Sequence, residues 1–249
     1  MHKFNFSMAT KVTPYRNSEL GKKEQVEQMF DNVSTNYDFL NRVLTFGLDI
    51  NWRKKVVKKV AQNNPKQLLD IATGTGDFAI MLAKLNPEKI IGLDISQGML
   101  NKGIEKIKKR NLGHIIDMVQ GNSENMPFKD DTFDAITVGF GVRNFENLDI
   151  GLKEIHRVLK PGGVLAILET SQPEKFPMKQ LFKLYSKYII PTIGSIFSKD
   201  KNAYSYLPES AAAFPYGKKF NNILQKNGFY NATDKPLTFG IASMYLATK

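Results

Sequence analysis

Short apolar runs follow one another at regular intervals through the middle of the chain. Five of them stand at residues 67–72, 89–94, 115–120, 133–140 and 164–170. Runs of this length that are apolar at nearly every position are typical of strands buried on both faces of a parallel sheet. Segments with helical spacing lie between them at 77–85, 96–110, with Ser96 as its N-cap, and 148–159. Strands that alternate with helices predict an α/β fold, with a doubly wound, mostly parallel sheet and right-handed crossovers.

The regions on either side of this pattern have a different character. Residues 1–22 are polar and lack periodicity, so we expect them to be flexible. Helical spacing predicts an N-terminal helical cap over 23–63 and a helical insert or lid over 173–215. Two runs between 229 and 248 then predict a closing antiparallel pair, which makes seven strands in a single domain over 23–249.

Charge and composition narrow the function classes. The 249 residues include 35 basic and 24 acidic side chains, a net charge of +11 that favours nucleic acid or anionic lipid as a partner, unless the lysines are simply solvated. There is no cysteine, and the three histidines lack metal-ligand spacing, so disulfides, thiol nucleophiles and a metal site are not expected. No run is long enough to span a bilayer and no secretory signal is present, so we expect a cytoplasmic protein.

The segment "LLDIATGTGD" at 68–77 carries the clearest ligand-binding signal. Its turn Gly74-Thr75-Gly76 follows a predicted strand and opens a helix in the pattern G-x-G-x-x-A, which lets a ligand approach the backbone. Asp94 ends the next strand, at about the spacing of the acid that binds a ribose in dinucleotide-binding proteins. Taken alone, the motif is compatible with an NAD-type cofactor or with a purely structural turn.

Two acids argue against a phosphate in this loop. Asp70 precedes it and Asp77 closes it, and a like charge about 4 Å away costs about 4 kcal/mol at an effective dielectric constant of 20. S-adenosylmethionine has no phosphate and carries a sulfonium and an ammonium group, so the same acids would favour it. Its ribose hydroxyls can donate to Asp94. Asn122 and Ser123 follow the third strand at the same sheet edge, where an amide can bind the adenine.

Longer segments of the chain resemble a known family. The glycine loop, "GLDIS" with Asp94, and "GNSENMPF" are similar to class I S-adenosylmethionine-dependent methyltransferases. "YDFLNRVLTFGLDINW" (37–52) and "RVLKPGGVLAILETS" (157–171) resemble the two signatures of the ubiquinone/menaquinone biosynthesis C-methyltransferases. The second fits at every defined position. The first departs at Leu40, Thr45 and Asp49, and many members carry histidine at the position of Asp49.

This resemblance covers the chain from about Lys23 to Lys249 and implies a Rossmann-like fold and a reaction. The implied reaction is C-methylation of a prenylated hydroquinone, with demethylmenaquinol converted to menaquinol. The alternative is a methoxy-polyprenyl-benzoquinol on the ubiquinone route. The resemblance implies cofactor contacts at Thr75, Asp94, Asn122 and Ser123, with Gly74 and Gly76 beside them.

The chemistry of a quinol ring sets the catalytic requirement. A neutral ring carbon is a weak nucleophile, whereas ionisation of a hydroxyl with a pKa near 10 pushes charge onto the ring. Arg143 follows the fourth strand in "GVRNF", and we expect it to stabilise this oxyanion, with Asn144 orienting the ring or a water molecule. Water or Asp49 would take the proton. The cap helices are expected to close over the cofactor, with Tyr37 nearest.

Other enzyme and binding classes fit less well. Amino-methylating nucleic-acid methyltransferases often carry an N/D-P-P-Y-like tetrapeptide after strand four and need a base-flipping pocket, but this chain reads "GFGVRN" there. A nucleotide-binding module without catalysis leaves Arg143, Asn144 and the insert unexplained. We therefore expect no nucleic-acid partner.

The insert contains an amphipathic segment over 177–197. Lys179, Lys183 and Lys187 form a basic stripe, and the helix is expected to end at Pro191. The apolar face consists of Leu181, Leu184, Tyr185, Tyr188 and Ile189. This pattern predicts peripheral contact with an anionic membrane, or else an ordinary lid helix whose apolar face packs on the core.

Overall fold

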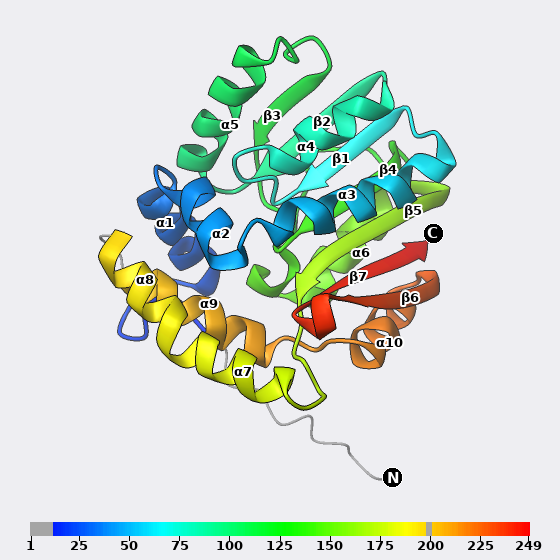
Figure 1. Ribbon diagram of the computed structural model, residues 1–249. Coiled ribbons are helices and arrows are strands. Elements are labelled where there is room, and N and C mark those ends of the chain that lie inside the picture. The colour runs from blue at the N-terminus through cyan, green and yellow to red at the C-terminus, as the bar shows by residue number, and fades with distance from the viewer. Residues whose placement is uncertain (1–11, 198–200) are drawn as a thin grey trace.

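Seven strands form one sheet at the centre of the molecule in the computed structural model, which describes residues 12–197 and 201–249 (Figure 1). The strand order is β3-β2-β1-β4-β5-β7-β6, with β7 antiparallel to both of its neighbours and the other pairings parallel. This arrangement confirms the predicted doubly wound α/β fold. The strands are β1 (Gln67–Ile71), β2 (Lys89–Asp94), β3 (Ile116–Gln120), β4 (Phe133–Gly139), β5 (Leu159–Thr170), β6 (Tyr230–Leu237) and β7 (Ala242–Thr248).

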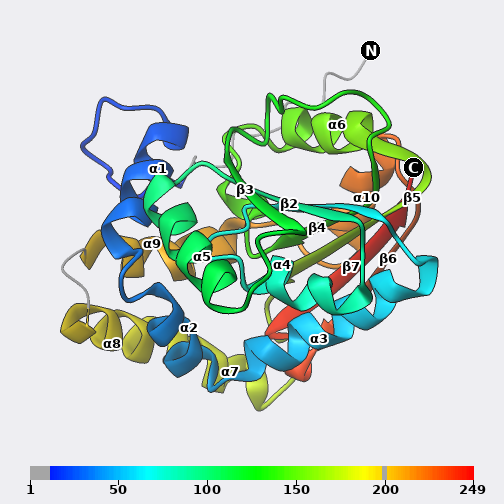
Figure 2. The same cartoon turned by 90° about the horizontal axis from the view of Figure 1, so that it is seen from above.

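Helices cover both faces of the sheet (Figure 2). One face packs against α3 (Leu48–Val60), α4 (Asp77–Leu82) and α5 (Gln97–Lys109) through a core that contains Trp52, Phe78 and Ile107. The other face packs against α6 (Leu148–Val158) and α10 (Lys218–Lys226) through Phe133, Leu152 and Phe220. Burial on both faces explains why the inner strands β1, β2, β4 and β5 have long apolar runs, whereas the edge strands β3 and β6 are more exposed. Short helical turns η1 (Ala61–Asn63), η2 (Ala83–Leu85), η3 (Val142–Asn144) and η5 (Thr238–Gly240) complete these layers.

A third group of helices lies beyond the carboxyl ends of β1 and its neighbours (Figure 1). It consists of α1 (Lys22–Val33), α2 (Tyr37–Thr45), α7 (Met178–Leu184), the π-helical turn η4 (Tyr185–Ile189), α8 (Ile190–Phe197) and α9 (Lys201–Ala213). A separate hydrophobic cluster that includes Met29, Leu40 and Tyr206 joins α1, α2 and α9. This group therefore covers the edge of the sheet at which α/β proteins bind ligands.

Local sequence accounts for several helix ends. The Ser96 side chain accepts a hydrogen bond from the Met99 N–H at 3.1 Å, as its predicted N-cap role requires. Asn147 accepts one from Ile150 in the same way at the start of α6.

Two predicted boundaries are wrong. The strand expected to start at 164 begins at Leu159, because Leu159 pairs with Phe133, and residues 162 and 163 exchange backbone hydrogen bonds with the C-terminal Lys249. The helix expected to end at Pro191 continues to Phe197 as α8. The turn before Pro191 is π-helical, with the Ile190 N–H donating to the Tyr185 carbonyl, and the helix continues through the proline.

Candidate active site

A pocket opens at the carboxyl ends of the parallel strands, beneath α1 and α2. Its wall includes Gly74 after β1, Asp94 at the end of β2, Asn122 after β3 and Asn144 after β4, and Tyr37 from α2 helps to cover it. The free volume is about 70 Å³.

Asp94 provides the pocket with a buried carboxylate. One of its oxygens accepts the Gly74 N–H at 2.7 Å and the other accepts the Ser96 N–H at 2.9 Å. Burial raises the pKa of Asp94 to about 6, although these hydrogen bonds lower it, and the nearby charge of Asp31 raises it further. Because each oxygen accepts only one of these hydrogen bonds, lone pairs remain for two hydroxyl donors.

The two loop glycines do different work. Gly74 has a φ of +58° and lies on the pocket wall, so a ligand can approach its backbone. Gly76 has a φ of +77° and begins α4, and a Cβ there would lie 3.5 Å from Met118 and 3.8 Å from the Gly103 backbone. These are ordinary contact distances, so the left-handed backbone and not the packing favours glycine at this position. Gly74 therefore contributes to the pocket, whereas Gly76 makes the turn.

Asp70 and Asp77 lie outside the pocket lining. The Thr73 and Thr137 hydroxyls donate to the two oxygens of the buried Asp70 at 2.5 and 2.6 Å. Burial raises the pKa of Asp70 to about 6 against these hydrogen bonds. Burial also acts to raise the pKa of Asp77, but Lys106 and nearby arginines outweigh it and lower that pKa. Asp77 is thus neutralised by cations and opposes a phosphate less than the sequence argument assumed.

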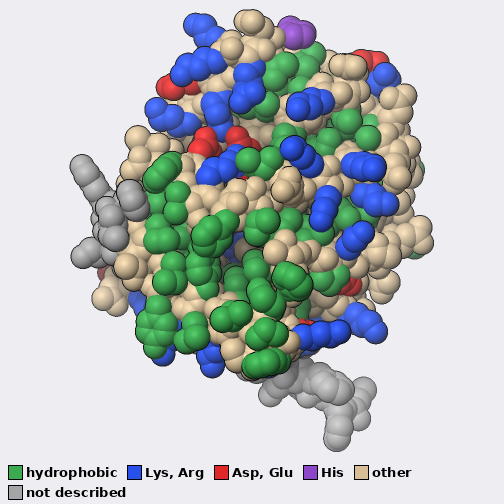
Figure 3. All heavy atoms as spheres, viewed as in Figure 1, with side chains coloured by type: hydrophobic (Ala, Val, Ile, Leu, Met, Phe, Trp, Pro, Cys, Tyr) green, Lys and Arg blue, Asp and Glu red, His purple; other side chains and the backbone are tan. Residues whose placement is uncertain are grey.

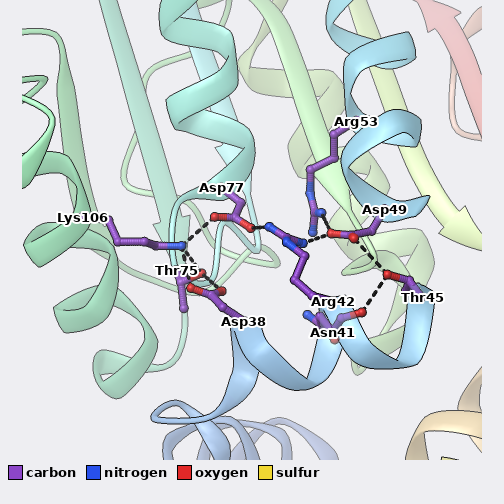
Figure 4. Close-up of polar contacts among 9 residues, drawn as sticks. All are labelled: Asp38, Asn41, Arg42, Thr45, Asp49, Arg53, Thr75, Asp77 and Lys106. Atoms are coloured by element: carbon purple, nitrogen blue, oxygen red, sulfur yellow. Dashed lines mark hydrogen bonds and ion pairs between the residues drawn. The ribbon is translucent and has the colours of Figure 1, made fainter. Parts of the chain in front are cut away.

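An ion-pair network ties α2 to the glycine loop (Figure 4). The Thr75 hydroxyl donates to Asp38 at 2.6 Å, and Lys106 donates to Asp38, Thr75 and Asp77 at 2.8, 2.8 and 2.6 Å. Arg42 bridges Asp77 to Asp49. We name Asp38, Arg42, Asp49, Arg53, Thr75, Asp77 and Lys106 the cap network. Since Tyr37 adjoins Asp38 on α2, the network holds Tyr37 over the pocket.

The side chains of Thr75 and Asp49, which were expected at the cofactor and at the substrate proton, both belong to the cap network. The Thr75 hydroxyl, expected at the cofactor, is engaged by Asp38 and Lys106. Asp49 is buried and accepts hydrogen bonds from Arg42, Arg53 and Thr45. A carboxylate held by two arginines is a poor proton acceptor, and Asp49 is absent from the pocket wall. The hypothesis that Asp49 takes the substrate proton does not fit this arrangement.

The expected catalytic pair occupies η3, directly after β4. Asn144 lies on the pocket wall, and its carbonyl oxygen accepts a hydrogen bond from the Tyr206 hydroxyl at 3.0 Å. The buried Arg143 side chain is absent from the pocket wall, and its guanidinium donates to the buried Glu169 carboxylate and to the Phe140 carbonyl, both at 2.6 Å. The Arg143 Nε is also buried, and no partner for it exists among the described residues.

Sequence reasoning missed Glu169 and Tyr206. Glu169 had a recognisable signal, because an acid inside the apolar strand "VLAILET" needs a cationic or hydrogen-bonding partner. Tyr206 had none, since it meets Asn144 only through the packing of α9. Burial raises the pKa of Tyr206 to about 12, so it remains a neutral hydrogen-bond donor.

The loop after β3 contributes unevenly. Asn122 reaches the pocket, and its carbonyl oxygen accepts the Glu124 N–H at 2.9 Å, which leaves the amide N–H₂ available. Ser123 is not on the pocket wall.

Within the described residues there is no cluster of three or more potential metal ligands. None of the helices in that part of the chain combines the length and apolar character needed to cross a membrane.

Comparisons with known proteins match nearly the whole chain. The model of the ubiE/COQ5 methyltransferase family matches residues 18–249. A demethylmenaquinone methyltransferase of Bacteroides fragilis is 52% identical over 241 residues, which covers 96% of this chain and 98% of that protein. A ubiquinone/menaquinone biosynthesis C-methyltransferase of Geotalea daltonii is 43% identical over 230 residues, covering 92% and 97%.

Solved structures show the same fold at low identity. An S-adenosylmethionine-dependent methyltransferase of Aquifex aeolicus superimposes with a TM-score of 0.57 at 20% identity, covering 78% of this chain and 88% of that one. The [4+2]-cyclase SpnF superimposes with a TM-score of 0.59 at 18% identity, covering 91% and 96%. At these identities the likeness concerns the fold alone.

Proposed function

Since this chain belongs to the ubiE/COQ5 methyltransferase family, we propose that it methylates a ring carbon of a prenylated hydroquinone, converting demethylmenaquinol to menaquinol. The relative with 52% identity supports this substrate, because it bears the name demethylmenaquinone methyltransferase. The name of the Geotalea relative keeps a benzoquinol of the ubiquinone route as the second candidate. The observation that carries the proposal is the strand-end pocket whose wall includes Asp94 from β2 and Asn144 after β4, the two strands on either side of β1.

The pocket residues fit S-adenosylmethionine, which supplies an electrophilic methyl group on a sulfonium sulfur. Asp94 would accept the two ribose hydroxyls, because its oxygens keep free lone pairs beside the Gly74 and Ser96 hydrogen bonds. Gly74 leaves room for the ligand along the backbone, and Asn122 would bind the adenine edge. We propose contacts for Thr75, Gly76 and Ser123 only through the backbone of their loops, since none of the three is on the pocket wall.

Asn144 and Arg143 would act on the quinol hydroxyl. Tyr206 donates to the Asn144 carbonyl oxygen, and one amide N–H of Asn144 donates to the Phe140 carbonyl at 3.4 Å, so the second amide N–H remains to donate toward the pocket. Glu169 fixes the Arg143 guanidinium and offsets part of its charge. Since Arg143 is absent from the pocket wall, its N–H donors that Glu169 and Phe140 leave free would act on the developing oxyanion through Asn144 or a water molecule rather than by direct contact. Water is the proposed proton acceptor.

We also propose that the protein works in the cytoplasm at the inner face of a membrane, because a prenylated quinol resides in the bilayer. Its basic charge then serves an anionic lipid surface rather than nucleic acid.

Quinone profiling tests the substrate directly. A strain that lacks this chain should accumulate demethylmenaquinone, and the wild-type gene should restore menaquinone, whereas a copy with Arg143→Ala should not. Accumulation of an unmethylated benzoquinone instead would favour the second candidate. An unchanged quinone profile would contradict both.

A further inference from the structure

A band of exposed hydrophobic side chains crosses the face of the molecule formed by the cap and the insert (Figure 3). The Tyr185 hydroxyl of η4 donates to the Leu44 carbonyl at 2.7 Å, and its ring lies 6.1 Å from Phe46 at the end of α2. At the other end, η5 packs near Pro173, which precedes α7. The apolar band consists of Phe46, Phe176, Leu181, Leu184, Tyr188, Ile189 and Phe239, each at least 45% exposed.

The apolar band contradicts the expectation that the insert helix buries its apolar face on the core. Of the predicted face, only Tyr185 turns inward, whereas Leu181, Leu184, Tyr188 and Ile189 point to solvent. Figure 3 shows hydrophobic side chains gathered over the cap and the insert on this face instead of being scattered singly. A contiguous exposed apolar surface of this kind marks an interaction site.

The backbone at two band positions gives independent support. Phe46 has a φ of +51° and is 79% exposed, and Phe239 has a φ of +57° and is 77% exposed. Left-handed backbone favours glycine or asparagine and disfavours bulky side chains. A phenylalanine that is only about one-fifth buried gains little stability to offset the strain of this backbone, so we take the two side chains to act on the surface.

Basic side chains border the apolar band. Residues 172–193 contain four lysines and a single acid, Glu174, and Lys179, Lys183 and Lys187 are exposed beside the band residues of α7 and η4. Helix α3 lies on the same face (Figure 1), where Figure 3 shows basic side chains, and its exposed residues include Lys54, Lys55, Lys58 and Lys59. An apolar strip between two basic groups matches the interface of an anionic bilayer.

We propose that the apolar band inserts into the interface of an anionic lipid bilayer while the flanking lysines contact the headgroups. This contact would give the enzyme access to a quinol that resides in the bilayer, and in that respect the proposal rests on the proposed function. A second copy of the chain fits less well, since a two-fold pairing through this face would bring the lysines of both copies together. The contact is interfacial, because the described helices are too short or too polar to span.

Vesicle flotation without quinol tests the contact. Wild-type protein should float with phosphatidylglycerol-containing vesicles at low salt, should be partly released at high salt, and should not float with pure phosphatidylcholine. Changing Lys179, Lys183 and Lys187 to Gln should weaken partitioning by about two orders of magnitude, roughly fivefold for each lysine. The matched control changes Lys108, Lys109 and Lys129 to Gln, which removes the same charge elsewhere and should float nearly as wild type.

A second variant tests the apolar part. It combines Phe46→Asn, Leu181→Gln, Leu184→Gln and Phe239→Asn, where asparagine suits the left-handed backbone and glutamine suits a helix. It should lose flotation even at low salt while it keeps its circular dichroism and its binding of S-adenosylhomocysteine. Loss of binding by the lysine control to the same degree, or wild-type flotation by the Asn/Gln variant, would overturn the proposal. So would a wild-type dimer that this variant turns into a monomer without vesicle binding.

A soluble substrate separates this proposal from the proposed function. With a short-chain, water-soluble quinol and no vesicles, the Asn/Gln variant should turn over as fast as wild type, whereas with a long-chain quinol in vesicles it should be at least tenfold slower. If wild type floats but methylates neither quinol, the docking surface stands and the proposed function is wrong. Equal turnover of the vesicle substrate by both proteins would remove the role of docking in substrate access.

Discussion

Replacing Asp70 with asparagine should stabilise the protein at alkaline pH. Asp70 is completely buried at the end of β1, and burial raises its pKa from 3.8 to about 6. The folded protein therefore holds this proton more tightly than the unfolded chain. The resulting stability is fully present below about pH 4 and is lost as the pH rises through about 6. At pH 8 the folded state bears the whole cost of the buried charge.

The magnitude follows from the pKa. Each pKa unit corresponds to about 1.36 kcal/mol, so the rise from 3.8 to about 6 represents about 3 kcal/mol at pH 8. The side-chain oxygen of asparagine can accept a hydrogen bond from one of the two threonine hydroxyls, and its N–H₂ can donate to the other hydroxyl once that hydroxyl rotates. Replacing one carboxylate hydrogen bond in this way costs about 1 kcal/mol. The expected gain is therefore about 2 kcal/mol in the free energy of unfolding at pH 8, falling by about 1 kcal/mol at pH 5.

Urea denaturation at pH 8 and pH 5 measures this difference, and Asp134→Asn provides a control of opposite sign. Burial acts to raise the pKa of Asp134, but hydrogen bonds from Lys160 and from the Gln67 and Lys66 backbone outweigh it and lower that pKa. Its ionised form stabilises the fold above about pH 4, so its asparagine variant should lose stability at pH 8. A loss of stability by Asp70→Asn at pH 8, or a gain that does not depend on pH, would refute the argument.

Local sequence patterns were sufficient to predict the central sheet and the position of the pocket. Five strands follow from apolar runs, and parallel strands necessarily bring their carboxyl ends to one edge. The residues directly after those strands, such as Gly74, Asp94, Asn122 and Asn144, therefore meet at a single pocket. This inference needs only the order of elements along the chain, which periodicity supplies.

Pairings between distant residues could not be predicted in this way. Lys106 meets Asp77 across 29 positions, Glu169 meets Arg143 across 26, and Tyr206 meets Asn144 across 62. The chain has 35 basic side chains, and nothing in its periodicity states which of them lies opposite which acid. The same reason explains the error at Leu159, whose strand is extended by pairing with Phe133 and with the C-terminus.

Three further predictions concern the site. Asp94→Ala should weaken S-adenosylhomocysteine binding by roughly 2–3 kcal/mol at pH 8 in isothermal titration, because two ribose hydroxyls lose a charged acceptor. The affinity of the wild-type protein should also fall below about pH 6, where the Asp94 carboxylate takes up a proton. A wild-type affinity that is unchanged from pH 8 to pH 5 would contradict this role of Asp94. Arg143→Ala should lower kcat at least a hundredfold, as expected for loss of a preorganised donor, while the Kd for S-adenosylhomocysteine changes less than about threefold; equal turnover would remove Arg143 from the mechanism. Lys106→Met should speed the release of S-adenosylhomocysteine about tenfold in stopped flow, since Asp38 and Asp77 then repel one another and α2 loosens over the pocket. Lys102→Met on the same helix removes only a longer ion pair to Glu105, at 3.6 Å between partly exposed side chains, and should change release little. If both methionine variants release the ligand at the wild-type rate, the cap network does not hold the cap closed.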